Sequence, residues 1–159
     1  MSGIDSYTKS MLHFQNRVWT FYGNAQIDTA QKPFATGGSL LLDGSGDYIS
    51  TPNSADFDMA DGDFTVDFWV RFNSVSYCGF IGNDADSGHG FLIYYNEDGL
   101  KAFVAYGSGS LKIFYKAWTP STDTWYHIAL VRSGATMKLY LNGVEQASTD
   151  AVTMRTPVA

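Results

Sequence analysis

Alternation of apolar and polar residues is the dominant pattern along this chain of 159 residues. Between Phe64 and Phe72 (FTVDFWVRF), Phe or Val occupies every second position, and Thr, Asp, Trp and Arg stand between them. Successive side chains of a β-strand point to opposite faces, so this spacing is typical of a strand with one buried face. The segment predicts a half-buried strand.

Similar patterns and turn signals predict a series of short strands. They are expected at Ser39–Leu42, Tyr48–Thr51, Phe91–Tyr95, Leu100–Tyr106, Leu111–Trp118, Trp125–Arg132 and Met137–Leu141. Asn142-Gly143 is the residue pair that a type I′ hairpin turn favours, because both positions tolerate positive φ. Many short strands with almost no helix indicate an all-β fold, an antiparallel β-sandwich or jelly roll, with a closed barrel as the alternative.

Composition supports one globular domain. A chain of this length is about one domain, and its charged fraction of 16% is low against the usual ~25%. We expect an N-terminal arm over residues 1–10 and the sandwich domain over residues 11–159. No apolar run approaches the ~18 residues of a membrane span, so membrane insertion is not expected.

Charge and the first residues limit the partners and the setting. The formal net charge is −6, and the cations are not clustered, which argues against nucleic acid as a partner. The opening residues (MSGIDSYTKS) lack the cationic and apolar pattern of a secretory signal. A domain acting outside a cell would then leave by another route, such as release in a virus particle. The single Cys78 forms no internal disulfide.

Four segments carry a resemblance to a known family. They are Ser39–Ser50 (SLLLDGSGDYIS), Asp63–Phe72 (DFTVDFWVRF), Asp123–Arg132 (DTWYHIALVR) and Met137–Glu145 (MKLYLNGVE). In this order they resemble the concanavalin A-like lectin/glucanase superfamily, and within it the laminin G-like domains of phage tail and other virion proteins. The resemblance implies two curved antiparallel sheets packed face to face.

The resemblance also implies closing strands beyond the position of Val158, which this sequence lacks. A sheet edge without its partner strand leaves N–H and C=O groups unpaired, and proteins usually cover such edges. We therefore expect copies of the same chain to cover the edge; the alternatives are another virion protein, a rearranged N-terminus, or no cover at all because the chain is a fragment.

Catalysis is not expected. Glucanases of this superfamily carry a Glu-x-Asp-x-Glu type of cluster, because retaining hydrolysis needs two carboxyl groups ~5 Å apart. Asp67 has Trp69, not an acid, at the next position on its face. A divergent polysaccharide-degrading enzyme, with Asp67 near Asp84 or Asp86, is the alternative. His127, at an alternating strand position, is expected to be packed or hydrogen-bonded.

The loop after Ile81 is the most ligand-like segment (NDADSGH, residues 83–89). Asp84 and Asp86 could supply oxygen ligands to Ca²⁺, although a solvated turn is the competing interpretation. Laminin G-like relatives often hold a calcium against the sandwich, so the resemblance adds Asp43 and Gly44 as a second metal candidate.

Sugar recognition needs exposed aromatic faces beside planar polar groups. The predicted carbohydrate site consists of Asn83, Asp84, Asp86 and His89, with Tyr94 and Tyr95 at its rim. The other strand aromatics considered are Trp69, Tyr106, Trp118 and Trp125, for which packing is the competing interpretation.

These observations predict a non-catalytic module of a virion surface, in the tail or capsid, that binds a surface glycan. An extracellular location is the alternative setting. A purely structural decoration or assembly protein without a ligand is the alternative function.

Overall fold

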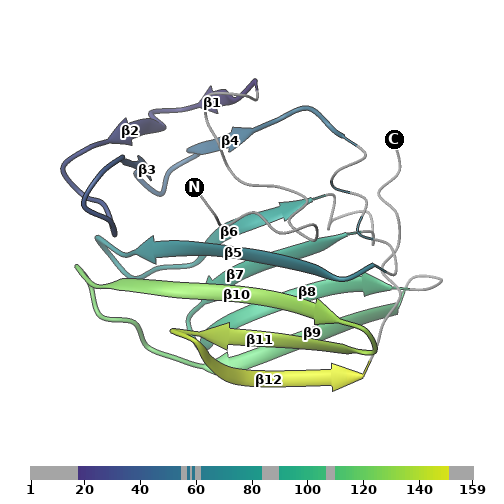
Figure 1. Cartoon of the computed structure of the whole chain (residues 1–159). Coiled ribbons are helices and arrows are strands. Elements are labelled where there is room, and N and C mark those ends of the chain that lie inside the picture. The colour runs from purple at the N-terminus through teal and green to yellow at the C-terminus, as the bar shows by residue number, and fades with distance from the viewer. Residues whose placement is uncertain are drawn as a thin grey trace. The chain divides into compact units, whose positions relative to one another are not determined.

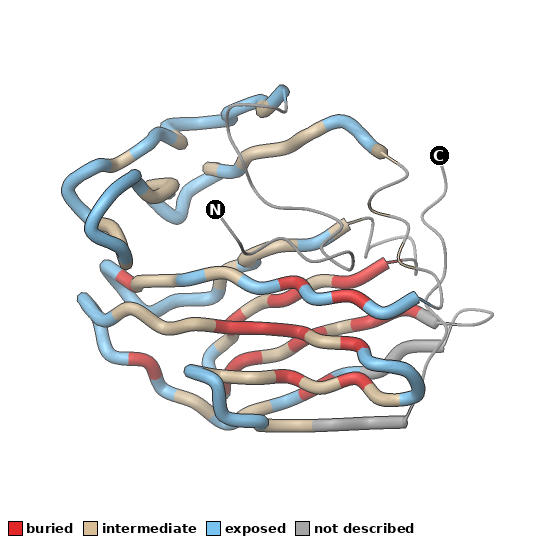
Figure 2. The backbone as a smooth tube through the Cα atoms, in the orientation of Figure 1, coloured by how far each residue is buried: buried red, intermediate tan, exposed pale blue. Residues whose placement is uncertain are grey.

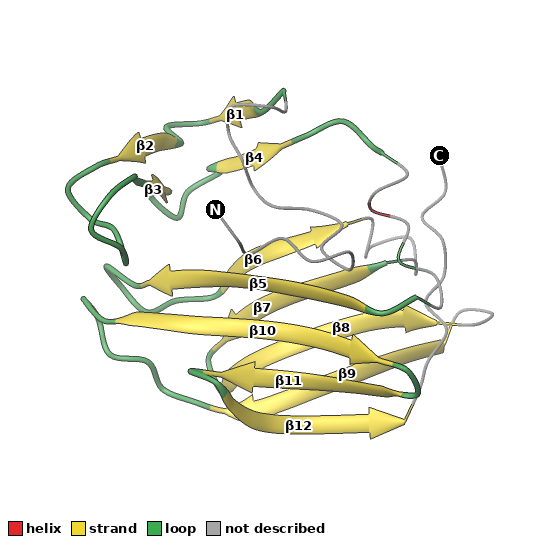
Figure 3. Cartoon of the chain, viewed as in Figure 1, coloured by secondary structure: helices red, strands yellow, loops and turns green. Residues whose placement is uncertain are grey.

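The structure, a computed structural model, describes residues 18–54, 57, 59, 62–83, 90–106 and 110–150. These residues form twelve strands and no α-helix, and none of them belongs to a helix able to cross a membrane. They fall into two compact units, the described residues of Met11–Ser54 and those of Ala55–Ala159. The larger unit contains two stacked sheets, seen as yellow arrows in Figure 3.

The sheet nearer the viewer in Figure 1, here the front sheet, has four antiparallel strands. They are β5 (Phe64–Arg71), β10 (Trp125–Ser133), β11 (Thr136–Leu141) and β12 (Val144–Asp150). Their order is β12-β11-β10-β5. The predicted strand at Phe64 is confirmed, with Phe64 and Val66 buried and Thr65 and Asp67 exposed.

The back sheet, behind it in Figure 1, has four antiparallel strands in the order β6-β7-β8-β9. They are β6 (Cys78–Asn83), β7 (Phe91–Asn96), β8 (Gly99–Tyr106) and β9 (Ser110–Ala117). Neighbours in sequence are neighbours in this sheet, and each pair is antiparallel.

The core lies between these two sheets, where the buried segments of both occur in Figure 2. The largest completely buried side chains are Ile93, Leu100, Val104, Ile128, Leu130, Met137 and Leu139. They come from strands of both sheets, so each sheet removes the other's apolar face from water. The described strands form an antiparallel sandwich, as predicted, rather than the closed barrel considered as the alternative.

The turn between β11 and β12 has the predicted type I′ geometry. Asn142 and Gly143 have φ values of 51° and 76°. The Asn142 side chain also accepts a hydrogen bond from the His127 N–H (2.9 Å), and the Asn142 N–H donates to the His127 carbonyl (2.8 Å). The turn therefore fixes the end of β11 against β10.

The smaller unit contains two short strand pairs. Its strands are β1 (Thr20–Tyr22), β2 (Gln26–Asp28), β3 (Ser39–Leu41) and β4 (Tyr48–Ser50). Strand β1 pairs with β4 and β2 with β3, both antiparallel. Tyr22 and Tyr48 face each other across the first pair with stacked rings, 4.2 Å between centroids.

Substitutions at two adjacent residues of β10 test which face of the strand is buried in the sandwich. Leu130 is completely buried, whereas Val131 points to the outer face. We expect Leu130→Ala to lower the free energy of unfolding by about 2–5 kcal/mol, because it leaves a cavity between the sheets. Val131→Ala should cost about 1 kcal/mol or less. Chemical denaturation of both variants measures the difference, and equal losses would contradict the assigned faces.

Candidate functional site

The outer face of the front sheet carries an aromatic pair beside a carboxylate. Trp69 of β5 faces His127 of β10 in the strand register, with ring centroids 5.2 Å apart. The His127 Nε2 lies 3.0 Å from Asp67 Oδ2, which orients the imidazole. Trp69 is 42% exposed although it belongs to a strand. The prediction that His127 is hydrogen-bonded is confirmed.

A row of side chains extends this group across all four strands. Asp67 pairs with Ala129, Ala129 with Tyr140, and Tyr140 with Glu145. Ala129 points outward but is only 6% exposed. The Ala129 methyl group is covered because it lies between two longer side chains, Asp67 on β5 and Tyr140 on β11. The short side chain also makes the surface shallower at Ala129 than at its two neighbours.

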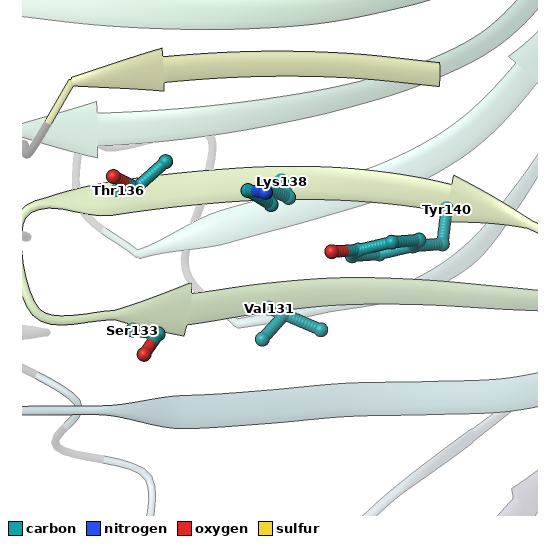
Figure 4. Close-up of a pocket in the computed structure, with 5 residues that line it drawn as sticks. All are labelled: Val131, Ser133, Thr136, Lys138 and Tyr140. Carbon is teal, nitrogen blue, oxygen red and sulfur yellow. The ribbon is translucent and has the colours of Figure 1, made fainter. Parts of the chain in front are cut away.

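A shallow hollow of about 300 Å³ adjoins the row. It is lined by Val131, Ser133, Thr136, Lys138 and Tyr140. Figure 4 shows these side chains rising from β10 and β11, with the Tyr140 ring lying along its strand. Tyr140 therefore belongs both to the hollow and to the row that contains Asp67.

Carboxylates neutralise the cations of this surface. The Lys138 Nζ lies 2.8 Å from Glu145 Oε2, and this hydrogen bond raises the pKa of Lys138 above its usual range. Arg71 forms an ion pair with Asp123 and donates to Asn73 Oδ1 at 2.6 Å. Each of these two cationic side chains therefore lies next to a carboxylate.

We call this surface the aromatic face. Its members are Asp67, Trp69, Arg71, Trp125, His127, Ala129, Lys138, Tyr140 and Glu145. Exposed ring faces stack on apolar C–H surfaces, while carboxylates accept hydrogen bonds from hydroxyl groups. The arrangement can bind a flat molecule that has both an apolar face and hydroxyl groups at its edge.

Three of the residues predicted for carbohydrate binding, Asp84, Asp86 and His89, lie outside the described residues. Asn83 ends β6 and has a structural role. Its Oδ1 accepts a hydrogen bond from the Phe91 N–H at 2.9 Å, and Gly90 lies so close that a Cβ there would be 2.2 Å from the Asn83 carbonyl oxygen. Asn83 thus joins β6 to the start of β7.

The two predicted rim tyrosines point in opposite directions, because they are consecutive in β7. Tyr94 is half-buried on the outer face of the back sheet, where its ring lies 6.1 Å from that of Tyr77. Tyr95 is 3% exposed and packs edge-on against Phe72 and Trp118 in the core. The placement of Tyr95 at a binding rim is incompatible with this burial.

The predicted metal residue Asp43 lies in an exposed loop with Gly44. Its carboxylate accepts hydrogen bonds from the Ser45 N–H (2.7 Å) and the Asn24 side chain (3.2 Å). Asp47 accepts from the N–H groups of Asn24 and Asp43. Within the described ranges, no group of three His, Cys, Asp or Glu residues is arranged to hold a metal ion.

Comparison with known proteins places the fold in a family. A model of the laminin G type (Laminin_G_3), described as concanavalin A-like lectin/glucanases superfamily, matches residues 43–158. The chain belongs to this superfamily. The match covers most of the strands described above, including every strand of the aromatic face. No curated protein sequence matches the chain.

Solved structures with a similar fold include two binding domains. The binding domain of Paraclostridial Mosquitocidal Protein 1 superimposes with a TM-score of 0.68 at 16% identity, covering 98% of this chain and 43% of that one. The carbohydrate binding module CBM66 from Bacillus subtilis gives 0.53 at 19% identity, covering 87% and 83%. This chain thus spans less than half of the first protein compared.

The Asp43 loop gives a prediction about pH. Hydrogen bonds from the Ser45 N–H and the Asn24 side chain lower the pKa of Asp43. Its ionised form therefore stabilises the folded loop above the ordinary carboxyl pKa of about 4, and this contribution is lost as the pH falls through the lowered value.

We expect Asp43→Ala to lower the thermal midpoint at pH 7 and to have a much smaller effect at pH 2.5. Glu97→Ala, which removes an exposed turn carboxylate, is the control. An Asp43→Ala effect of the same size at both pH values would contradict the assigned hydrogen bonds.

Proposed function

We propose that this chain is a non-catalytic module that binds neutral glycans through the aromatic face. The observation that carries the proposal is the exposed Trp69 ring beside the hydrogen-bonded pair of His127 and Asp67. A pyranose ring stacks on an aromatic side chain through its C–H groups and directs its hydroxyls sideways to planar polar groups. On the aromatic face, Asp67 and Tyr140 are the polar groups proposed to meet the hydroxyls of a sugar stacked on Trp69.

The charges of the face favour a neutral ligand. Arg71 is paired with Asp123, and Lys138 with Glu145. A sulfated or uronic-acid polysaccharide would have to compete with these carboxylates for each cation, in a chain whose net charge is already −6. A neutral hydroxyl group meets no such repulsion.

The hydrogen bonds of the carboxylates on the aromatic face support a binding rather than a catalytic role. Retaining hydrolysis needs one carboxylate as nucleophile and a second carboxyl as acid, ~5 Å apart. On the aromatic face, Asp67 is bonded to His127 and Glu145 to Lys138. Each of these carboxylates is therefore already engaged by a neighbouring side chain. The resemblance of the fold to a carbohydrate binding module and to the binding domain of a mosquitocidal protein supports the same proposal.

The setting of the module is also a proposal, based on the sequence resemblance. We place it at a virion surface, in the tail or capsid, where binding of a host glycan would attach the particle. Copies of the chain or other virion proteins are its proposed partners there, and Ca²⁺ remains a proposal for the loops of Asp43 and Gly44 and of Asp84 and Asp86.

Removing the stacking ring tests the binding surface. We expect Trp69→Ala to weaken retardation of the chain in native gels containing starch, cellulose derivatives, chitin derivatives, levan or mannan by roughly 3- to 10-fold on the polysaccharide that retards it most. Phe34→Ala removes an exposed aromatic side chain of the smaller unit and is the matched control. Equal retardation of both variants and the unmodified chain would refute the aromatic face as the site.

A comparison of neutral with charged polysaccharides tests the ligand class. We expect dextran sulfate, heparin and polygalacturonate to cause no retardation at 150 mM NaCl, and raising the salt concentration to 500 mM to leave retardation by the neutral polymer unchanged. Ion-pair attraction is screened over that range, whereas stacking is not. Binding of only the anionic polymers, lost at high salt, would refute neutral-glycan binding. The absence of any retardation would favour a structural module without a ligand.

A further inference from the structure

The hollow on β10 and β11 lies too far from the Trp69 ring for one sugar unit to contact both. Trp69 pairs with His127, and Val131, which lines the hollow, stands four residues further along β10. With about 3.4 Å per residue along a strand and about 4.8 Å between strands, the Cα atoms of Trp69 and Val131 are about 14 Å apart. A pyranose is similar in size to one six-membered aromatic ring. Only a chain of several units can therefore reach from the ring into the hollow.

Two polar side chains lie between Trp69 and the hollow. Asp67 and Tyr140 flank Ala129 in one register row, which is next to the row of Trp69. Ala129 is only 6% exposed, because these longer neighbours cover its methyl group. Figure 4 shows the Tyr140 ring along β11, with its hydroxyl end directed towards Lys138. A line of polar groups thus leads from the Trp69 ring to the hollow.

The hollow itself offers hydroxyl groups and no unpaired charge. Ser133 and Thr136 face each other in register at one end, and Tyr140 lines the other. Among the side chains that the structure describes, no hydrogen bond occupies these three hydroxyls. Each can both donate and accept, as sugar hydroxyls do. The Lys138 amino group is 2.8 Å from Glu145 Oε2 and is already neutralised.

We propose that the aromatic face binds a stretch of about three sugar units of a linear neutral glycan, rather than one terminal sugar. One end unit stacks on Trp69 and the other enters the hollow, so the glycan runs from β5 across β10 to β11. Asp67 and Tyr140 lie between the end units and bind their hydroxyls. This inference rests on the proposed function and adds to it the length and direction of the ligand.

The pairing of the strands favours a glycan over an extended peptide on this line. Strand β10 is paired with β5 on one side and with β11 on the other, so its backbone offers no free edge to a peptide strand. Side chains alone face the ligand, and they are an aromatic ring, hydroxyls and carboxylates that are already hydrogen-bonded. Contacts at both ends of one covalent chain reinforce each other, because the second contact is intramolecular.

The dependence of affinity on ligand length tests the extended site. The probes are oligosaccharides of two to six units from the neutral polymer that retards the chain most, namely malto-, cello-, chito-, manno- or levan-oligosaccharides. We expect Kd in titration calorimetry to fall by roughly 10-fold between two and four units and to change little with further length, because the hollow is then occupied.

Substitutions that fill the hollow should remove this gain. We expect Ser133→Leu and Thr136→Leu each to raise the Kd of the tetrasaccharide by roughly 3- to 10-fold and to leave that of the disaccharide unchanged. Thr65→Leu is the matched control, because Thr65 is exposed on the same face and pairs with Val131 but does not line the hollow. Circular dichroism melts check that each variant is folded.

The outcomes separate this inference from the proposed function. Equal Kd values for the disaccharide and the tetrasaccharide, both raised by Trp69→Ala, would refute the extended site and leave the proposed function standing. A gain with length that Thr65→Leu removes, and that both hollow variants leave intact, would place the ligand along β5 and refute the hollow as its end. Binding at every length that is insensitive to Trp69→Ala would refute the proposed site, and this inference with it.

Discussion

The apolar layer between the two four-stranded sheets is the constraint on which the rest of the larger unit depends. Ile93 and Leu100 enter it from the back sheet, and Ile128, Leu130 and Leu139 from the front sheet, all without solvent exposure. Burial of apolar area is the main favourable term in folding, and a two-layer sandwich is how twisted sheets with one apolar face achieve it. The alternation that supplies this layer also determines what remains outside.

Because side chains alternate, every inward residue places its neighbours on an outer face. Phe68 and Val70 pack against the core and so expose Trp69 between them. Ile93 and Tyr95 are buried and leave Tyr94 outside. A sandwich has two such faces, and in this molecule both carry aromatic rings next to polar groups. On the front face, the charges beside the rings are paired with one another.

Strand prediction worked where alternation was clean and failed where glycine interrupted it. Strand β5 was predicted to within one residue, whereas β6 (CGFIGN) was missed, because Gly79 and Gly82 weaken the apolar pattern and a bulge shifts its register. The candidate carbohydrate residues are neighbours along one loop and the strand after it. Of these, Tyr94 lies on an outer face, whereas Tyr95 is in the core and Asn83 braces β6 against β7.

The sequence by itself determined the fold class, the inward and outward positions of the main strands, and the Asn142-Gly143 turn, because these depend on local periodicity and backbone preferences. Only the tertiary structure decided which outward residues meet. Trp69 and His127 are 58 positions apart and become neighbours through the register of β5 with β10, which no local pattern specifies. A binding surface on a sheet is built across strands, perpendicular to the direction in which the sequence is read, and register is set by the packing of the whole core.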